Sequence, residues 1–101
     1  MSTAPLPVTI DDIHAAAAAL EGQVARTPMI PAPQLSGILG CELHLKLETL
    51  QRTGSFKDRG AYNKLRSLDE AQRRRGVVAM SAGNHAQGVA YHATRLAIPS
   101  T

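Results

Sequence analysis

The sequence has few aromatic residues and almost no cysteine. Of its 101 residues only 3% are aromatic, tryptophan is absent, and Cys41 is the single cysteine. A lone cysteine excludes a disulfide within the chain and is typical of a reducing compartment, so we expect the cytoplasm. The scarcity of rings means that any core is built from aliphatic side chains and alanine. The composition therefore excludes a small secreted scaffold held together by disulfides.

Long apolar runs and a strong excess of one charge are missing as well. The alanine run Ala15–Ala19 follows Asp11 and Asp12, is too short to cross a bilayer, and lacks the basic start of a signal peptide. The net charge is +3, and the only basic run, Arg73–Arg75, stands directly before Gly76. Cations are favoured at that place because it suits the end of a helix. We therefore expect neither a membrane nor a nucleic acid as a partner.

What remains is the composition of a globular protein, 44% hydrophobic and 19% charged. Residues 1–8, with Pro5 and Pro7, predict a flexible lead-in, and residues 9–101 predict one unit. Capping residues and apolar spacing predict helices at about 9–23, 34–39, 57–66, 67–76 and 85–96. The second last of these is predicted from Ser67 and Glu70 as a capping box.

Two strands are predicted between these helices. Alternation over 42–48 turns Leu43, Leu45 and Leu47 toward one buried face and leaves Lys46 and Glu48 solvated. The unbroken apolar run 77–80 is typical of a parallel strand covered on both faces. The prolines of 26–33 predict an extended segment with no regular element. This order is an α/β pattern, and two strands are too few for its sheet, so we expect the front part of a larger domain.

The stretch from Thr53 to Gly60 predicts a turn that enters a helix. Ser55 suits the N-cap, with the carboxylate of Asp58 reaching back to free N–H groups, and Lys57 then lies in the first turn. Helical spacing places Lys57 on one arc with Ala61 and Leu65. An amine at such a place is suited to imine formation with a carbonyl cofactor. The alternative is a surface lysine whose aliphatic stem covers apolar neighbours.

The second suggestive stretch is Ser81–Asn84, a loop of small residues between the strand 77–80 and a helix. Backbone N–H groups and the positive end of the helix dipole make such a loop suitable for a carboxylate or phosphate. The alternative is a plain connection. His85 and His92 are seven residues apart and lack a third ligand at metal spacing, so we expect no metal site.

Taken together, three stretches are specific: Lys46–Glu48, Gln51–Ala61 and Ser81–Ala90. In this order they resemble pyridoxal-phosphate enzymes of the tryptophan-synthase-β type (fold type II), and among these the threonine/serine dehydratases, or threonine ammonia-lyases. Cysteine and threonine synthases usually carry Asn-Pro before Thr-Gly-Ser, where this chain has Gln51-Arg52. Serine racemases are similar too, but typically place a serine as second base where this chain has Ala82.

The resemblance, which runs from about Thr9 onward, implies a role for each matched residue. It implies pyridoxal phosphate as cofactor, with Lys57 as the Schiff-base lysine and the base for the α-proton, Phe56 beside the ring, and Asn84 on the 3-hydroxyl. The substrate carboxylate is implied to lie in the loop, on Ser81, Ala82, Gly83 and His85. The implied reaction converts L-threonine to 2-oxobutanoate and ammonia, or L-serine to pyruvate and ammonia.

The resemblance also implies a larger protein. In the family a glycine-rich phosphate cup follows the part that matches here, and the full-length protein is implied to be a homo-oligomer acting on a small amino acid. The setting is amino-acid metabolism, with isoleucine biosynthesis and catabolism both open. Two further hypotheses stay open: an inactive fragment or interaction piece, and a serine racemase-like or other β-replacement or elimination enzyme of the same type.

Overall fold

The computed structural model describes residues 4–101. Its elements, in chain order, are α1 (Ile10–Leu20), β1 (Met29–Pro31), α2 (Pro33–Leu39), β2 (His44–Lys46), the 3-10 turn η1 (Glu48–Leu50), α3 (Lys57–Arg66), α4 (Glu70–Arg75) and α5 (Asn84–Arg95). None of the helices in this part of the chain is long and apolar enough to cross a bilayer.

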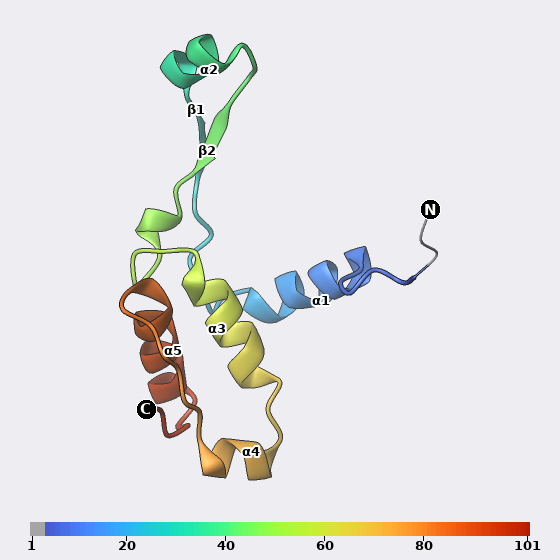
Figure 1. Cartoon of the computed structure of the whole chain (residues 1–101), viewed down its shortest axis with the longest axis vertical. Helices are drawn as coiled ribbons and strands as arrows, with labels where there is room; N and C mark the ends of the chain where they lie inside the picture. Colours follow the sequence, from blue (N-terminus) through green and yellow to red (C-terminus); the bar gives the residue numbers. More distant parts are fainter. Residues whose placement is uncertain (1–3) are drawn as a thin grey trace.

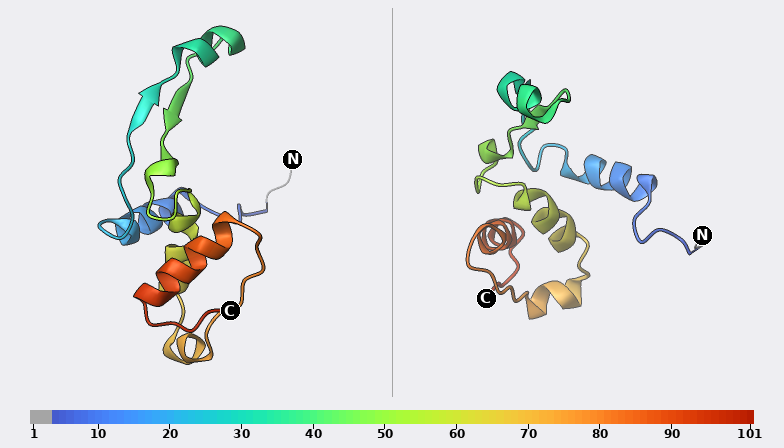
Figure 2. Two further views of the ribbon diagram at one scale, coloured as in Figure 1. Left: turned by 90° about the vertical axis from the view of Figure 1, so that its left-hand side faces the viewer. Right: turned by 45° about the horizontal axis from the view of Figure 1, so that its top comes forward.

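Helices α3 and α5 pack side by side and form the body of the structure, as Figures 1 and 2 show. α1 packs against α3, and the hairpin of β1, α2 and β2 projects from this body as an arm (Figure 1). A small aliphatic core lies at the lower end of α3 and α5, where Leu65, Ala93 and Ile98 are buried together. The predicted helical spacing is confirmed here, because Ala61, Leu65, Val89 and Ala93 are all buried.

Local capping signals set most helix ends as expected. At α1, Thr9 and Asp12 form a capping box, with the Asp12 N–H donating to Thr9 Oγ1 at 3.2 Å and the Asp12 carboxylate accepting from the Thr9 N–H at 2.8 Å. α1 nevertheless ends at Leu20, earlier than predicted. At α2, Gly40 takes the left-handed conformation (φ 67°) that ends a helix.

The start of α4 was predicted at the wrong residue. Its N-cap is Asp69, which accepts from the Gln72 N–H at 2.7 Å, while Gln72 Oε1 accepts from the Asp69 N–H at 3.0 Å. Ser67 keeps a helical backbone (φ −77°, ψ −11°) and donates its hydroxyl to Lys64 O at 2.6 Å. It therefore still belongs to the end of α3 and is not free to cap the next helix.

The arm corrects the two predictions made for its strands. β1 pairs antiparallel with β2, Met29 opposite Lys46 and Pro31 opposite His44, so the prolines do not exclude a strand. Pro31 is tolerated because it stands at the end of a short edge strand. The strand predicted at 42–48 is reduced to three residues, and Leu45 is 38% exposed. No described element covers the face that the alternation predicted to be buried.

The strand predicted at 77–80 is present only as one parallel bridge, Val77 with Ser100. Val77 N–H donates to Pro99 O at 2.8 Å, and Thr101 N–H donates to Val77 O at 3.0 Å. The parallel direction is as predicted, but the expected burial on both faces is wrong, since Val78 and Met80 are 85% and 99% exposed. The fold is thus part of an α/β domain whose sheet is barely started in the described residues.

Candidate functional site

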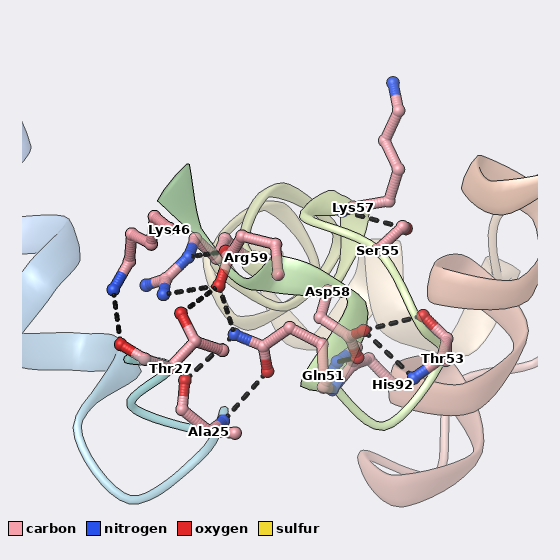
Figure 3. A network of polar contacts seen from close by, with 11 residues as sticks. Ala25, Thr27, Lys46, Gln51, Thr53, Ser55, Lys57, Asp58, Arg59 and His92 are labelled. Atoms are coloured by element: carbon pink, nitrogen blue, oxygen red, sulfur yellow. Dashed lines mark hydrogen bonds and ion pairs between the residues drawn. The ribbon is translucent and has the colours of Figure 1, made fainter. Parts of the chain in front are cut away.

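Lys57 is the first residue of α3, half-buried, at the place where the sequence predicted a reactive amine. Ser55 Oγ accepts from the Lys57 N–H at 3.2 Å, so Ser55 does cap this helix start. Within residues 4–101 the Lys57 amine has no hydrogen bond and no ion pair, and it lies 5.2 Å from the centre of the Phe56 ring. Figure 3 shows the side chain pointing away from the polar network beneath it.

A groove next to Lys57 brings the two predicted stretches together. Its volume is about 350 Å³, and it is lined by residues 45–49, by Gly54, Ser55 and Phe56, and by Asn84 at the start of α5. Phe56 and Asn84 therefore share one groove, although 28 positions separate them in the chain. A larger hollow of about 530 Å³ lies beside the end of α1 and contains none of the predicted site residues.

The loop before α5 lies at the helix N-terminus, as predicted. Ser81 Oγ accepts from the Gly83 N–H at 3.2 Å, and Gly83 directly precedes the first helical residue. Ser81 is half-buried, whereas Ala82, Gly83 and His85 are exposed and do not line the groove. Only Asn84 of this stretch reaches the groove, so the other four residues stay a prediction for the substrate carboxylate.

Under the groove, Glu48 was predicted to be solvated, and this is wrong. Its side chain is only 15% exposed and forms an ion pair with Arg59 through both carboxylate oxygens. Thr27 Oγ1 and Gln51 Nε2 also donate to it, at 2.6 Å and 3.1 Å. The hydrogen bond from Arg59, with smaller contributions from Thr27 and Gln51, lowers the pKa of Glu48 from 4.5 to about 2. This network joins the base of the arm to α3 (Figure 3).

Asp58 neither caps the helix through Ser55 nor is solvated, as the sequence had suggested. It is 1% exposed, and one oxygen lies 2.6 Å from His92 Nε2 on α5. The other oxygen accepts from Thr53, at 2.6 Å from the hydroxyl and 3.2 Å from the N–H. His92 has no exposed surface, and the rings of Tyr62 and Tyr91 meet it edge-on, which fits their predicted packing role. The Asp58–His92 pair, joining residues 34 apart, was missed.

Gly88 is the second residue that sequence analysis missed. A Cβ built on it would lie 3.3 Å from the carbonyl carbon and oxygen of Lys57, so only glycine lets α5 approach this closely. One signal could have found it. Asn84, Gly88 and His92 recur every four residues, which places them on one face of α5.

These features suit an aromatic aldehyde cofactor. The free amine of Lys57 suits the aldehyde, the exposed Phe56 ring suits an aromatic face, and the Asn84 amide suits a phenolic oxygen. Residues 4–101 contain no group of three or more histidine, cysteine or acidic residues placed to hold a metal.

Comparison with known proteins points to the same cofactor. Residues 20–101 match the family described as "Pyridoxal-phosphate dependent enzyme". The chain is 53% identical over 94 residues to the L-threonine ammonia-lyase of Thermotoga maritima, covering 93% of this chain and 23% of that protein. It is 52% identical over 96 residues to the catabolic L-threonine dehydratase TdcB of Escherichia coli K12, covering 95% of this chain and 29% of that protein.

Solved structures give the same picture. A bacterial-strain threonine deaminase, described as that of T.th., superposes with a TM-score of 0.77 at 42% identity, covering 93% of this chain and 33% of that one. Maize serine racemase superposes with a TM-score of 0.83 at 39% identity, covering 94% of this chain and 30% of that one. The chain thus spans 23 to 29% of the two curated relatives and matches them over nearly its whole length. It belongs to the family of pyridoxal-phosphate-dependent enzymes, as part of a fold type II domain.

Proposed function

We propose that the protein to which this chain belongs is an ammonia-lyase that converts L-threonine, and also L-serine, to a 2-oxo acid and ammonia. The observation that carries the proposal is the Lys57 amine. It lies at the start of α3 without a hydrogen bond or ion pair to any described residue, beside a groove lined by Phe56 and Asn84. A lysine kept unpaired next to an aromatic ring and an amide is suited to bind a carbonyl cofactor.

In this proposal three residues hold the cofactor, namely Lys57 by its amine, Phe56 by its ring and Asn84 by its side-chain amide. Pyridoxal phosphate, when bound, supplies an electron sink for the carbanion that forms at the substrate's α-carbon. Lys57 Nζ takes the α-proton, and the β-hydroxyl then leaves as water. The loop residues Ser81, Ala82, Gly83 and His85 orient the substrate carboxylate at the N-terminus of α5, where the helix dipole favours an anion.

The relatives support the substrate class. Their names include L-threonine ammonia-lyase, L-threonine dehydratase and, in Pseudomonas sp, L-threo-3-hydroxyaspartate ammonia-lyase at 52% identity. Threonine and 3-hydroxyaspartate are both amino acids with a hydroxyl group on the β-carbon, so loss of water across the α- and β-carbons is open to each of them. We therefore propose a β-hydroxy amino acid as the substrate.

The test compares two lysines of α3 in the full-length protein expressed from the natural gene. Lys57→Ala should abolish formation of 2-oxobutanoate from L-threonine, since both the cofactor amine and the base are lost. Lys64→Ala removes an exposed lysine two turns further along the same helix and should keep the activity of the natural protein. An active Lys57→Ala protein would refute the proposal.

Racemisation of serine is the second candidate, because serine racemases of maize and Dictyostelium discoideum both superpose with a TM-score of 0.83. A racemase needs a second base on the opposite face of the α-carbon, and the serine typical of racemases is replaced by Ala82, whose methyl group cannot move a proton. Measurement of D-serine formation beside pyruvate formation separates the two activities. Elimination without D-serine is the result that we expect.

A further inference from the structure

The contact between α3 and α5 contains a buried polar pair for which the proposed chemistry has no use. Asp58 and His92 are 1% and 0% exposed, and Asp58 Oδ1 lies 2.6 Å from His92 Nε2. They are the largest fully buried side chains in the described part of the chain. Burying a carboxylate costs free energy unless hydrogen bonds satisfy it, so a polar pair in an aliphatic core needs an explanation.

Arg95 fixes which nitrogen of His92 carries the proton. Arg95 NH1 lies 3.2 Å from His92 Nδ1, and a guanidinium can only donate hydrogen bonds. Nδ1 is therefore the acceptor, and we assign the proton to Nε2, which donates it to Asp58. Arg95 itself is anchored to the segment after α1, because it donates to the carbonyl of Gln23 at 3.0 Å and to Gln23 Oε1 at 2.9 Å.

Asp58 completes the chain of bonds on the side of the lysine loop. Its second oxygen accepts from both the hydroxyl and the N–H of Thr53, four residues before Lys57. The carboxylate thus accepts three hydrogen bonds, one from α5 and two from the loop that leads into α3. Figure 3 shows Asp58 between Thr53 and His92, with Lys57 directed to the other side.

The same face of α5 fixes Lys57 in a second way. Asn84, Gly88 and His92 are spaced by four residues and so lie in one row along the helix. Asn84 lines the groove, Gly88 lies against the backbone of Lys57, and His92 binds Asp58. The register of α5 along α3 therefore sets how far the Lys57 amine stands from the Asn84 amide.

We propose that Asp58 and His92 are positioning residues: their directional hydrogen bond locks the register of α5 on the first turn of α3 and so places the Lys57 amine. The inference rests on the proposed role of Lys57 as the reactive amine. A pair that only fills the core would be replaced by apolar side chains without consequence for Lys57, whereas a positioning pair would not.

The test is the rate at which an acylating reagent labels Lys57 in the cofactor-free, full-length protein, expressed as a ratio to Lys64 and read by mass spectrometry. Lys64 is exposed on the same helix and corrects for reagent and unfolding. His92→Phe keeps the ring but removes the donor, and should shift the ratio by at least about threefold. His92→Gln keeps an N–H close to the place of Nε2 and should return the ratio toward that of the natural protein.

A double variant keeps the inference testable if His92→Phe does not fold. Asp58→Leu with His92→Leu removes both polar groups together and leaves no buried charge unpaired. It should fold and yet show the shifted ratio, because the directional bond is gone. A ratio equal to that of the natural protein would overturn the inference and reduce the pair to core filling. This readout uses neither cofactor nor substrate, so it holds even if threonine is not the substrate.

In the cofactor-loaded protein the same double variant gives a second readout. Misplacement of Lys57 should lower kcat by about 10-fold while KM changes by less than about 2-fold, because the substrate carboxylate site is untouched. A fall in thermal stability alone, with kcat unchanged, would contradict the inference.

Discussion

Gly88 of α5 lies against the backbone of Lys57, closer than any other residue type could. A Cβ built on Gly88 would stand 3.3 Å from the carbonyl carbon and oxygen of Lys57 and 3.4 Å from its Cβ. These atoms belong to the first turn of α3, which has little freedom to move away. The missing side chain of Gly88 therefore determines how α5 and the lysine-bearing turn fit together.

Substitution Gly88→Ala should accordingly harm activity more than stability. Overpacking costs about 1 to 3 kcal/mol, but alanine is favoured by about 1 kcal/mol over glycine inside a helix, so much of the cost is offset. The displaced Lys57 should lower kcat by about 10-fold. Gly60→Ala is the matched control, because a Cβ there meets no atom of residues 4–101 within 4 Å. Equal kcat values in the two variants would contradict this account.

Acid should weaken the fold through Glu48. Its pKa is lowered from 4.5 to about 2, chiefly by Arg59, so the native state favours the ionised form. The stabilisation is complete above about pH 4.5 and is lost as the pH falls toward 2. At neutral pH it amounts to about 3 kcal/mol. Urea unfolding across this range should show Glu48→Gln with a flatter dependence on pH than the natural protein.

The exposed pair of Glu70 and Arg74 supplies the control for that measurement. Their side chains are 80% and 74% exposed, and solvent screens such pairs strongly. Glu70→Gln should therefore retain the steep acid dependence. If Glu48→Gln and Glu70→Gln behave alike, the Glu48–Arg59 ion pair is not the source of the acid sensitivity.

The start of α4 gives a prediction that separates two neighbouring residues. Asp69→Ala should cost about 1 kcal/mol in free energy of unfolding, because it removes the acceptor for the Gln72 N–H. Ser67→Ala should cost less than about 0.5 kcal/mol, since the exposed hydroxyl bonds only Lys64 O. Thermal unfolding of both variants checks the order, and the reverse order would return the cap to Ser67.

The helices could be predicted because their signals act over a few residues. The capping box of Thr9 and Asp12 and the left-handed Gly40 depend on contacts within one turn, and the structure confirms both. Asp69 was missed for the same reason in reverse, because Ser67 offered an equally good local pattern. The strands could not be predicted in their extent, since pairing and burial depend on neighbours distant in the sequence.

The site could be predicted only where a motif carried it. The stretch around Lys57 and the loop ending at Asn84 were found, and the structure places Phe56 and Asn84 on one groove. The polar pairs were not found, because Asp58 and His92 are 34 residues apart and Glu48 and Arg59 are 11 apart. A side chain at such positions looks like a solvated surface residue until the packing of α3 on α5 is known.

The most direct test of the central claim is to find the residue that bears the cofactor. The full-length protein is loaded with pyridoxal phosphate, reduced with borohydride and digested, and each lysine peptide is examined for the added mass of a pyridoxyl group. The account predicts the label on Lys57 and none on Lys46 or Lys64. A label on another lysine, or an unlabelled Lys57 in a protein that binds the cofactor, would contradict it.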